Sequence, residues 1–225
     1  MNIDRYAYLL LGLFFLLFWL VAYFLRKDLR SMMLHVSFAG AICGPISEFW
    51  FFRDYWLPPT IFGKGLLLPE DVIFGFAVFG VAFAILPVIS KNFFSSPYSP
   101  FPMGLPMFVG SFFIGFFFFT DLFGINSIFA ASLTMFIWAV TLIFLRHDLF
   151  FPSLWSGVFL AFFAFIIYLA LLGITTDYLR QYWLLWGQPM GFAVFGVPMT
   201  EVLWYFCLGS STIAVTSFSE GKKLM

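Results

Sequence analysis

Five carboxylate positions stand out because each lies within or at the end of a long apolar segment of the chain. Glu48 lies about 16 residues into one segment, Glu70 and Asp71 open another, Asp121 closes a third, and Glu201 lies about ten residues into the last. Ionisable groups at membrane depth are costly, so we treat these five as candidate functional residues. Burial in apolar surroundings raises the pKa of a carboxylic acid, which then keeps its proton and can act as a general acid on an apolar substrate.

Structural roles are open for three of these acids. Glu70 and Asp71 follow Pro69 at an expected helix start, where acids interact favourably with free backbone N–H groups. Asp121, at a segment end, can simply face the lipid headgroups. Glu48 and Glu201 lie at no obvious helix end, and we therefore favour a role in a site for both.

The elements that carry these acids are expected to lie in a membrane. The chain has 225 residues, of which 63% are hydrophobic and only 10% are charged. A soluble domain has roughly 25% charged residues, so the composition excludes a soluble protein and equally a disordered one. The net charge is zero and there is no basic face, which argues against nucleic-acid binding. No cluster has metal-ligand spacing and no Gly-rich nucleotide motif follows a strand, so we expect no metal and no other cofactor.

The apolar blocks predict membrane-spanning helices, because a span needs about 20 apolar residues and these blocks are continuous, unlike the alternating strands of a barrel. We expect an all-α integral membrane protein whose seven spans cover 6–25, 32–52, 72–89, 104–122, 127–145, 152–172 and 192–214. Seven basic residues then fall on one side, namely Arg26, Lys27, Arg30, Lys91, Arg146, Lys222 and Lys223, and four on the other, namely Arg5, Arg53, Lys64 and Arg180. The positive-inside rule places the N-terminus outside the cell membrane and the C-terminus in the cytoplasm.

Short motifs recur in the two halves of the chain. The sequence LRKDL at 25–29 follows the first span and LRHDL at 145–149 follows the fifth, while RDYW at 53–56 follows the second span and RQYW at 180–183 follows the sixth. We predict two parallel three-helix repeats, residues 1–90 and 125–225, joined by a linking transmembrane helix within 91–124, with a site between the repeats. Chance likeness between short aromatic loops is the alternative.

Tryptophan residues lie close in sequence to two of the acids. Trp50 follows Glu48 and Trp204 follows Glu201, and an aromatic face at such a place can stabilise a cation. These two are our best candidates for aromatic walls of a pocket. For the other tryptophans near the segment ends, including Trp56 and Trp186, an aromatic belt at the membrane interface is the more common role.

Two groups of residues carry a likeness to a known family. The first group is Glu48, Trp56 and LPEDVIF at 68–74, and the second is Asp177, Trp186 and VPMTEVLW at 197–204. In this duplicated order the chain resembles the small integral-membrane lycopene cyclases of archaea, some bacteria and fungi, with two units fused. It departs from their pattern because Pro69 directly precedes the acidic pair and Thr200 replaces the first acid of the second unit. Pairing RDYW with RQYW instead would match Trp56 with Trp183.

The resemblance implies a lycopene β-cyclase, which is a redox-neutral isomerase. A carboxylic acid protonates the terminal double bond of an acyclic carotene, the next double bond attacks the tertiary cation, and loss of a proton leaves a β-ring. The implied catalytic residues are Glu48, Glu70, Asp71 and Glu201, with Glu201 or Glu70 favoured as the proton donor. The implied substrate-binding residues are Trp50, Trp56, Asp121, Asp177, Trp186 and Trp204. The partners implied are lycopene or a related polyprenyl substrate, membrane lipid and other carotenoid-pathway enzymes, and the oligomeric state is left open.

Three other functions were weighed against this one. A membrane cyclase for another polyprenyl or meroterpenoid substrate fits the same residues. A small parallel-repeat transporter fits the span layout, but a sugar path needs polar residues at mid-span and these spans are rich in Phe. A retinal protein needs a lysine in its last span, whereas Lys222 and Lys223 lie in the tail.

Overall fold

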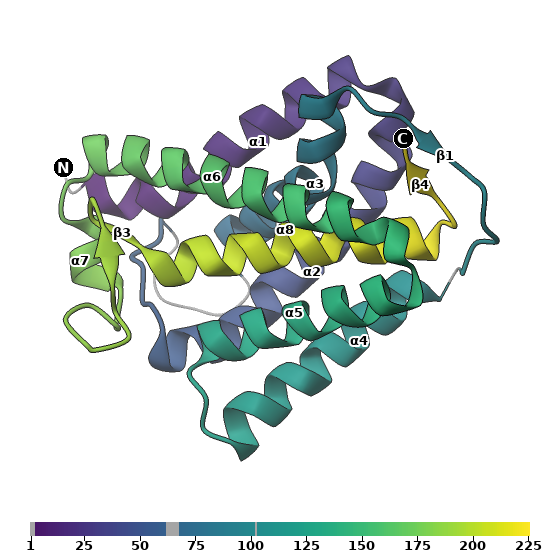
Figure 1. Ribbon diagram of the computed structural model, residues 1–225. Coiled ribbons are helices and arrows are strands. Elements are labelled where there is room, and N and C mark those ends of the chain that lie inside the picture. The colour runs from purple at the N-terminus through teal and green to yellow at the C-terminus, as the bar shows by residue number, and fades with distance from the viewer. Residues whose placement is uncertain (1–2, 62–67, 102) are drawn as a thin grey trace.

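The computed structural model describes residues 3–61, 68–101 and 103–225, so that Lys64 lies outside the described residues. The fold is a bundle of long helices (Figure 1). Seven helices are long and apolar enough to cross a membrane, as the sequence predicts. The long helices are α1 (Ala7–Leu25), α2 (Arg30–Asp54), α3 (Pro69–Ser90), α4 (Gly104–Phe117), α5 (Ser127–Leu145), α6 (Phe150–Ile174) and α8 (Met199–Ser219).

Short elements join these helices. A π-helical turn, Phe118–Leu122, continues α4, and 3-10 turns cover Ile3–Tyr6, Lys27–Leu29 and His147–Leu149. The other short elements are α7 (Tyr178–Tyr182) and the strands β1 (Phe94–Ser95), β2 (Ala193–Val194), β3 (Val197–Pro198) and β4 (Lys223–Leu224).

The prediction for the last span is wrong at both ends, because it was expected to end at Ala214 and α8 ends at Ser219. The last span was expected to begin at Phe192, but α8 begins at Met199. The preceding residues form the β2–β3 hairpin, in which Phe195 and Gly196 adopt positive φ angles of 51° and 81° and so cannot be helical. Glu201 therefore lies in the first turn of α8 and not ten residues into a helix. The other six predicted spans agree with the helices to within three residues at each end.

The helices form two triplets, α1–α2–α3 and α5–α6–α8, which we call the first and second triplets. Helix α3 packs on α1 and α2, α8 packs on α5 and α6, and α3 meets α6 and α8 between the triplets. The closest approaches use glycine, because a Cβ atom at Gly40 would clash with the backbone of Gly75, and one at Gly209 would clash with Ser156. Helix α4 lies outside both triplets, against α5 and α8 (Figure 1).

The same contacts close one end of each triplet. The Arg26 guanidinium donates to the carbonyl oxygen of Pro87, in the last turn of α3, and to that of Asn92, just after this helix. In the same way, Arg146 donates to the carbonyl oxygen of Ser217, in the last turn of α8, and to that of Lys222, just after it. Strands β1 and β4 then pair antiparallel, Phe94 opposite Leu224. Helices α1, α3, α5 and α8 therefore all end on the same side of the bundle. Duplication of the chain itself stays a prediction.

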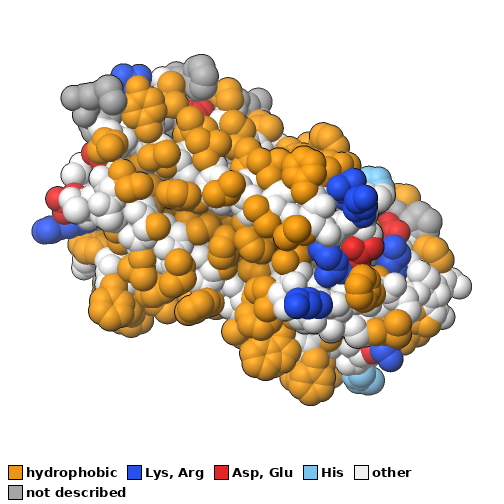
Figure 2. Space-filling view, turned by 90° about the horizontal axis from the view of Figure 1, so that it is seen from above, with side chains coloured by type: hydrophobic (Ala, Val, Ile, Leu, Met, Phe, Trp, Pro, Cys, Tyr) orange, Lys and Arg blue, Asp and Glu red, His pale blue; other side chains and the backbone are white. Residues whose placement is uncertain are grey.

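This end also gathers the basic residues. Figure 2 shows most of the visible Lys and Arg side chains at one end of the molecule, next to a broad hydrophobic surface. Large apolar side chains are exposed along the spans, among them Leu17, Ile114 and Phe162 at 63%, 71% and 65%. An apolar flank with charges at its ends is the surface expected of a protein that spans a bilayer.

Candidate active site

Two adjoining cavities lie where α2, α3 and α8 meet. They have volumes of about 40 and 30 Å³ and share Glu48, Phe51, Phe74 and Trp204 in their walls. We call the pair the acid cavity, because Glu48 and Glu201 both line it. The rest of its wall is mostly aromatic or apolar and includes Tyr55, Trp56, Tyr168, Ile128, Met135 and Phe112.

Glu48 reaches the acid cavity from α2, in the first triplet. It lies one turn after Gly44, where α2 approaches α3 so closely that a Cβ atom on Gly44 would meet the carbonyl oxygen of Asp71. The Glu48 side chain is 4% exposed, and its Oε2 accepts a hydrogen bond from Trp56 Nε1 at 3.1 Å. A buried carboxyl group that accepts a hydrogen bond from Trp56 and lies beside an apolar cavity is well placed to hold or release a proton.

Glu201 enters the same cavity from the second triplet. Glu201 is 8% exposed, and its Oε1 accepts a hydrogen bond from the hydroxyl of Tyr55, the residue just after α2. Burial, followed by the nearby Glu201, raises the pKa of Tyr55 well above its usual value, so the phenol stays neutral and acts as the donor. The Tyr168 hydroxyl also lies near Glu201. The hydrogen bond to Tyr55 thus links the two triplets at the cavity.

Glu70 and Asp71 are buried, but neither lines the acid cavity. Asp71 Oδ2 accepts a hydrogen bond from the Leu68 backbone N–H at 3.0 Å, and Glu70 Oε1 accepts one from the Ile61 N–H at 2.9 Å. These bonds tie the start of α3 to the backbone of Ile61 and Leu68. The capping role left open for both residues fits this geometry.

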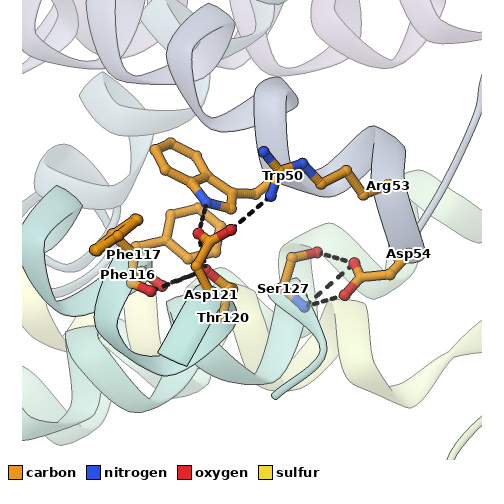
Figure 3. Close-up of polar contacts among 8 residues, drawn as sticks. All are labelled: Trp50, Arg53, Asp54, Phe116, Phe117, Thr120, Asp121 and Ser127. Atoms are coloured by element: carbon orange, nitrogen blue, oxygen red, sulfur yellow. Dashed lines mark hydrogen bonds and ion pairs between the residues drawn. The ribbon is translucent and has the colours of Figure 1, made fainter. Parts of the chain in front are cut away.

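Asp121 holds the C-terminal end of α4 against α2 (Figure 3). Its two carboxylate oxygens accept hydrogen bonds from Trp50 Nε1 and from an Arg53 guanidinium nitrogen, both at 2.7 Å, and Thr120 Oγ1 donates at 3.0 Å. We call this group the Asp121 clasp. Trp50 stacks on α4 there, with its ring 4.9 Å from that of Phe116, and it does not line the acid cavity. Nearby, Asp54 accepts hydrogen bonds from the Ser127 backbone and hydroxyl, which ties α2 to α5 (Figure 3).

The remaining predicted substrate-binding residues divide. Trp56 and Trp204 line the acid cavity, whereas Asp177 is exposed at the start of α7 and Trp186 is 37% exposed. Trp183 rather than Trp186 lies opposite Trp56, because the backbones of the two loops form an antiparallel bridge there. Of the two repeat alignments considered, the one that matches RDYW with RQYW agrees with this bridge.

Comparisons with family models, with curated proteins and with solved structures found no match to this chain. The chemistry is therefore argued from the residues themselves. Among the described residues, no group of three or more His, Cys, Asp or Glu side chains could hold a metal ion.

Two tyrosines in the cavity wall, Tyr55 and Tyr168, are not among the predicted site residues. Tyr55 belongs to the RDYW motif, whose position at the end of a span is also typical of an aromatic belt at the membrane interface. Tyr168 lies in an unbroken apolar block, and its signal was its position, 120 residues after Glu48, the same interval that separates Arg26 from Arg146. A search for the residue 120 positions after Glu48 could therefore have identified Tyr168 from the sequence.

Proposed function

We propose that this protein is a membrane carotenoid cyclase that acts on the acyclic end of lycopene or a closely related polyprenyl chain. The observation that supports this most strongly is a pair of buried carboxyl groups, Glu48 and Glu201, on different triplets and in the wall of one aromatic cavity. Proton-initiated cyclisation needs an acid, a base, walls that stabilise a cation and the exclusion of water. Trp56, Trp204 and Tyr168 supply aromatic faces to such a cation.

We assign the acid to Glu48 and the base to Glu201. Tyr55 donates a hydrogen bond to Glu201, and a donor of this kind favours the ionised form of a carboxyl group. Glu48 instead accepts its hydrogen bond from the indole N–H of Trp56, which is a weaker donor than a phenol, and it is 4% exposed against 8% for Glu201. Glu70, which the sequence also favoured as donor, is bonded to the loop backbone and lies outside the cavity wall, so we give it a structural role.

The proposed reaction balances without an electron donor or acceptor. The carboxyl proton of Glu48 adds to the terminal double bond and leaves a tertiary cation. The next double bond forms the ring by attacking that cation, and Glu201 removes a proton to leave the ring double bond. The product is an isomer of the substrate, and a proton must pass from Glu201 back to Glu48 before the next turnover.

The main alternative within this chemistry is another polyprenyl or meroterpenoid substrate, which the same acids would serve. A transporter is less well supported, because a path for a polar solute needs polar walls and Ser47 is the one neutral hydroxyl or amide side chain besides the tyrosines in the described lining of the acid cavity. We also propose the orientation predicted from the basic residues, with the end that carries Arg26 and Arg146 in the cytoplasm of the cell.

Expression in a lycopene-making bacterial host, followed by pigment analysis, tests the function. The expected result is conversion of lycopene into a monocyclic or bicyclic carotene of the same mass. Folded protein in the membrane with lycopene as the only pigment would refute the carotene substrate, and parallel expression with a meroterpenoid pathway would then test the alternative.

A further inference from the structure

Two further small cavities lie beneath α4, next to the acid cavity. One, of about 10 Å³, shares Phe79 with the acid cavity, and the next, of about 30 Å³, shares Val215 with the first. We call these two cavities the α4 channel. They lie between α4 and α8, and their walls include Ala39, Leu105, Phe108, Val109, Trp138 and Phe218. The path leads from Glu201 at the start of α8 to Ser219 at its end, about 27 Å at 1.5 Å per residue.

The wall formed by α4 is suited to move. Its inner face carries Phe108, Phe112 and Phe116 at four-residue spacing, and all three are buried. Beyond α5 and α8, α4 reaches α2 mainly through side chains, namely the Asp121 clasp and the contact of Trp50 with Phe116. The cavities hold at most a few water molecules, so an apolar chain can enter only if α4 shifts outward from α2.

We propose that the unreacted remainder of the substrate lies in the α4 channel, parallel to the helices, and enters from the lipid between α2 and α4. This inference rests on the proposed function. A linear polyprenyl chain fits the path because it is narrow and apolar, and the path is nearly as long as the hydrocarbon core is thick, roughly 30 Å. The substrate class is thereby narrowed to long linear polyprenyl chains, in contrast to small terpenoids that the acid cavity alone would serve.

A larger groove on the other side of the bundle does not meet these requirements. It has a volume of about 380 Å³ and lies between the end of α3 and the start of α6, with Leu86, Trp155 and Phe159 in its wall. It shares no lining residue with the acid cavity. A chain in that groove would have no described connection to Glu48 or Glu201.

The test compares two substitutions on α4. Val109→Phe adds bulk inside the channel, whereas Ile114→Phe adds it on the lipid-facing side, where Ile114 is 71% exposed. Each variant, in membranes, receives lycopene or a shortened acyclic polyene with the same reacting end. We expect Val109→Phe to lower the rate of lycopene cyclisation by about tenfold or more, because the larger side chain fills the channel that the tail of lycopene needs. The rate with the short polyene should fall by less than about twofold, because that substrate has no tail in the channel. Ile114→Phe should leave both rates unchanged.

Three results separate the possible failures. If the wild type cyclises neither substrate, the proposed function fails. If the wild type is active and Val109→Phe slows both substrates equally, or neither, the channel is refuted while the function stands. Val109→Leu adds one methylene and should also slow lycopene cyclisation more than cyclisation of the short polyene, by a smaller factor. This second variant keeps the test decisive if the Phe variant does not fold.

Discussion

The first and second triplets present different side chains at matching positions, and the acid cavity depends on that difference. By position along their helices, Glu48 is the 19th residue of α2 and Tyr168 the 19th of α6, while Asp71 is the third residue of α3 and Glu201 the third of α8. Each triplet thus supplies one carboxyl group to the cavity, but from a different helix. The residue at the same helix position as Glu48 is a tyrosine, Tyr168, and the one at the same position as Glu201 is a helix-capping aspartate, Asp71.

Asp71 and Glu201 show how similar local positions acquire different roles. Each is the third residue of its helix. Asp71 accepts a hydrogen bond from the backbone N–H of Leu68, the residue just before its own helix, while Glu201 accepts one from Tyr55 in the other triplet. The shorter aspartate side chain suits the local bond, and the extra methylene of glutamate lets the carboxyl group extend toward the cavity. A pair of triplets with identical residues would hold two capping acids, or two cavity acids that repel each other.

The largest expected effect comes from removing the two cavity acids. Glu48→Gln and Glu201→Gln should each lower cyclisation by about 100-fold or more, since an amide can neither donate nor accept the transferred proton. Glu70 is a buried acid outside the cavity wall, so Glu70→Gln is the matched control. Per amount of folded protein, this variant should keep most of the wild-type activity. Initial rates of carotene formation in membranes measure all three, and wild-type rates in both cavity variants would refute the assignment.

The next comparison concerns two tyrosines that occupy matching places in the bridged loops. Tyr55→Phe removes the hydrogen bond to Glu201 and should lower the rate by about tenfold, because a bond to a charged group contributes about 1.5–3 kcal/mol. Tyr182, whose backbone carbonyl accepts a hydrogen bond from the Leu57 N–H, does not line the acid cavity, and Tyr182→Phe should change the rate little. Equal losses in the two variants would contradict a specific role for Tyr55.

A smaller difference is expected between the facing tryptophans. Trp56→Phe removes the N–H donor to Glu48 and should slow the reaction about fivefold, in line with a net contribution near 1 kcal/mol for one hydrogen bond. The buried Nε1 of Trp183 has no hydrogen-bond partner, so Trp183→Phe loses none. Its rate should stay close to that of the wild type once the amounts of folded protein are equal.

The arginines that close the two triplets should behave alike. Arg26→Lys and Arg146→Lys each lose a guanidinium that bonds a neighbouring Asp and backbone carbonyls, and each should lower stability by about 1 kcal/mol without a specific effect on catalysis. Thermal unfolding in detergent measures both. A large loss in one variant and none in the other would show that the two ends are not built the same way.

Sequence by itself determined much of this architecture. Continuous apolar blocks predicted seven helices, because a bilayer leaves no other way to satisfy the backbone, and the scarce acids identified every carboxyl group that the cavity uses. The start of α8 was missed since the hairpin before it is also apolar, so hydropathy does not mark its end. The likeness of LRKDL to LRHDL correctly drew attention to residues with the same contacts, Arg26 and Arg146.

Tertiary structure alone decided which of those acids act together. The sequence favoured a site role for Glu48 and Glu201 and left a structural role open for Glu70, Asp71 and Asp121, but it did not show which of the five share a cavity. In the structure, the first two line the acid cavity, Glu70 and Asp71 hold the start of α3, and Asp121 forms the Asp121 clasp. The physical reason is that a sequence gives spacing along each helix, whereas the facing of one helix toward another depends on packing. Close contacts such as Gly40 on Gly75 set the rotation of α2 against α3, and with it the direction in which Glu48 points.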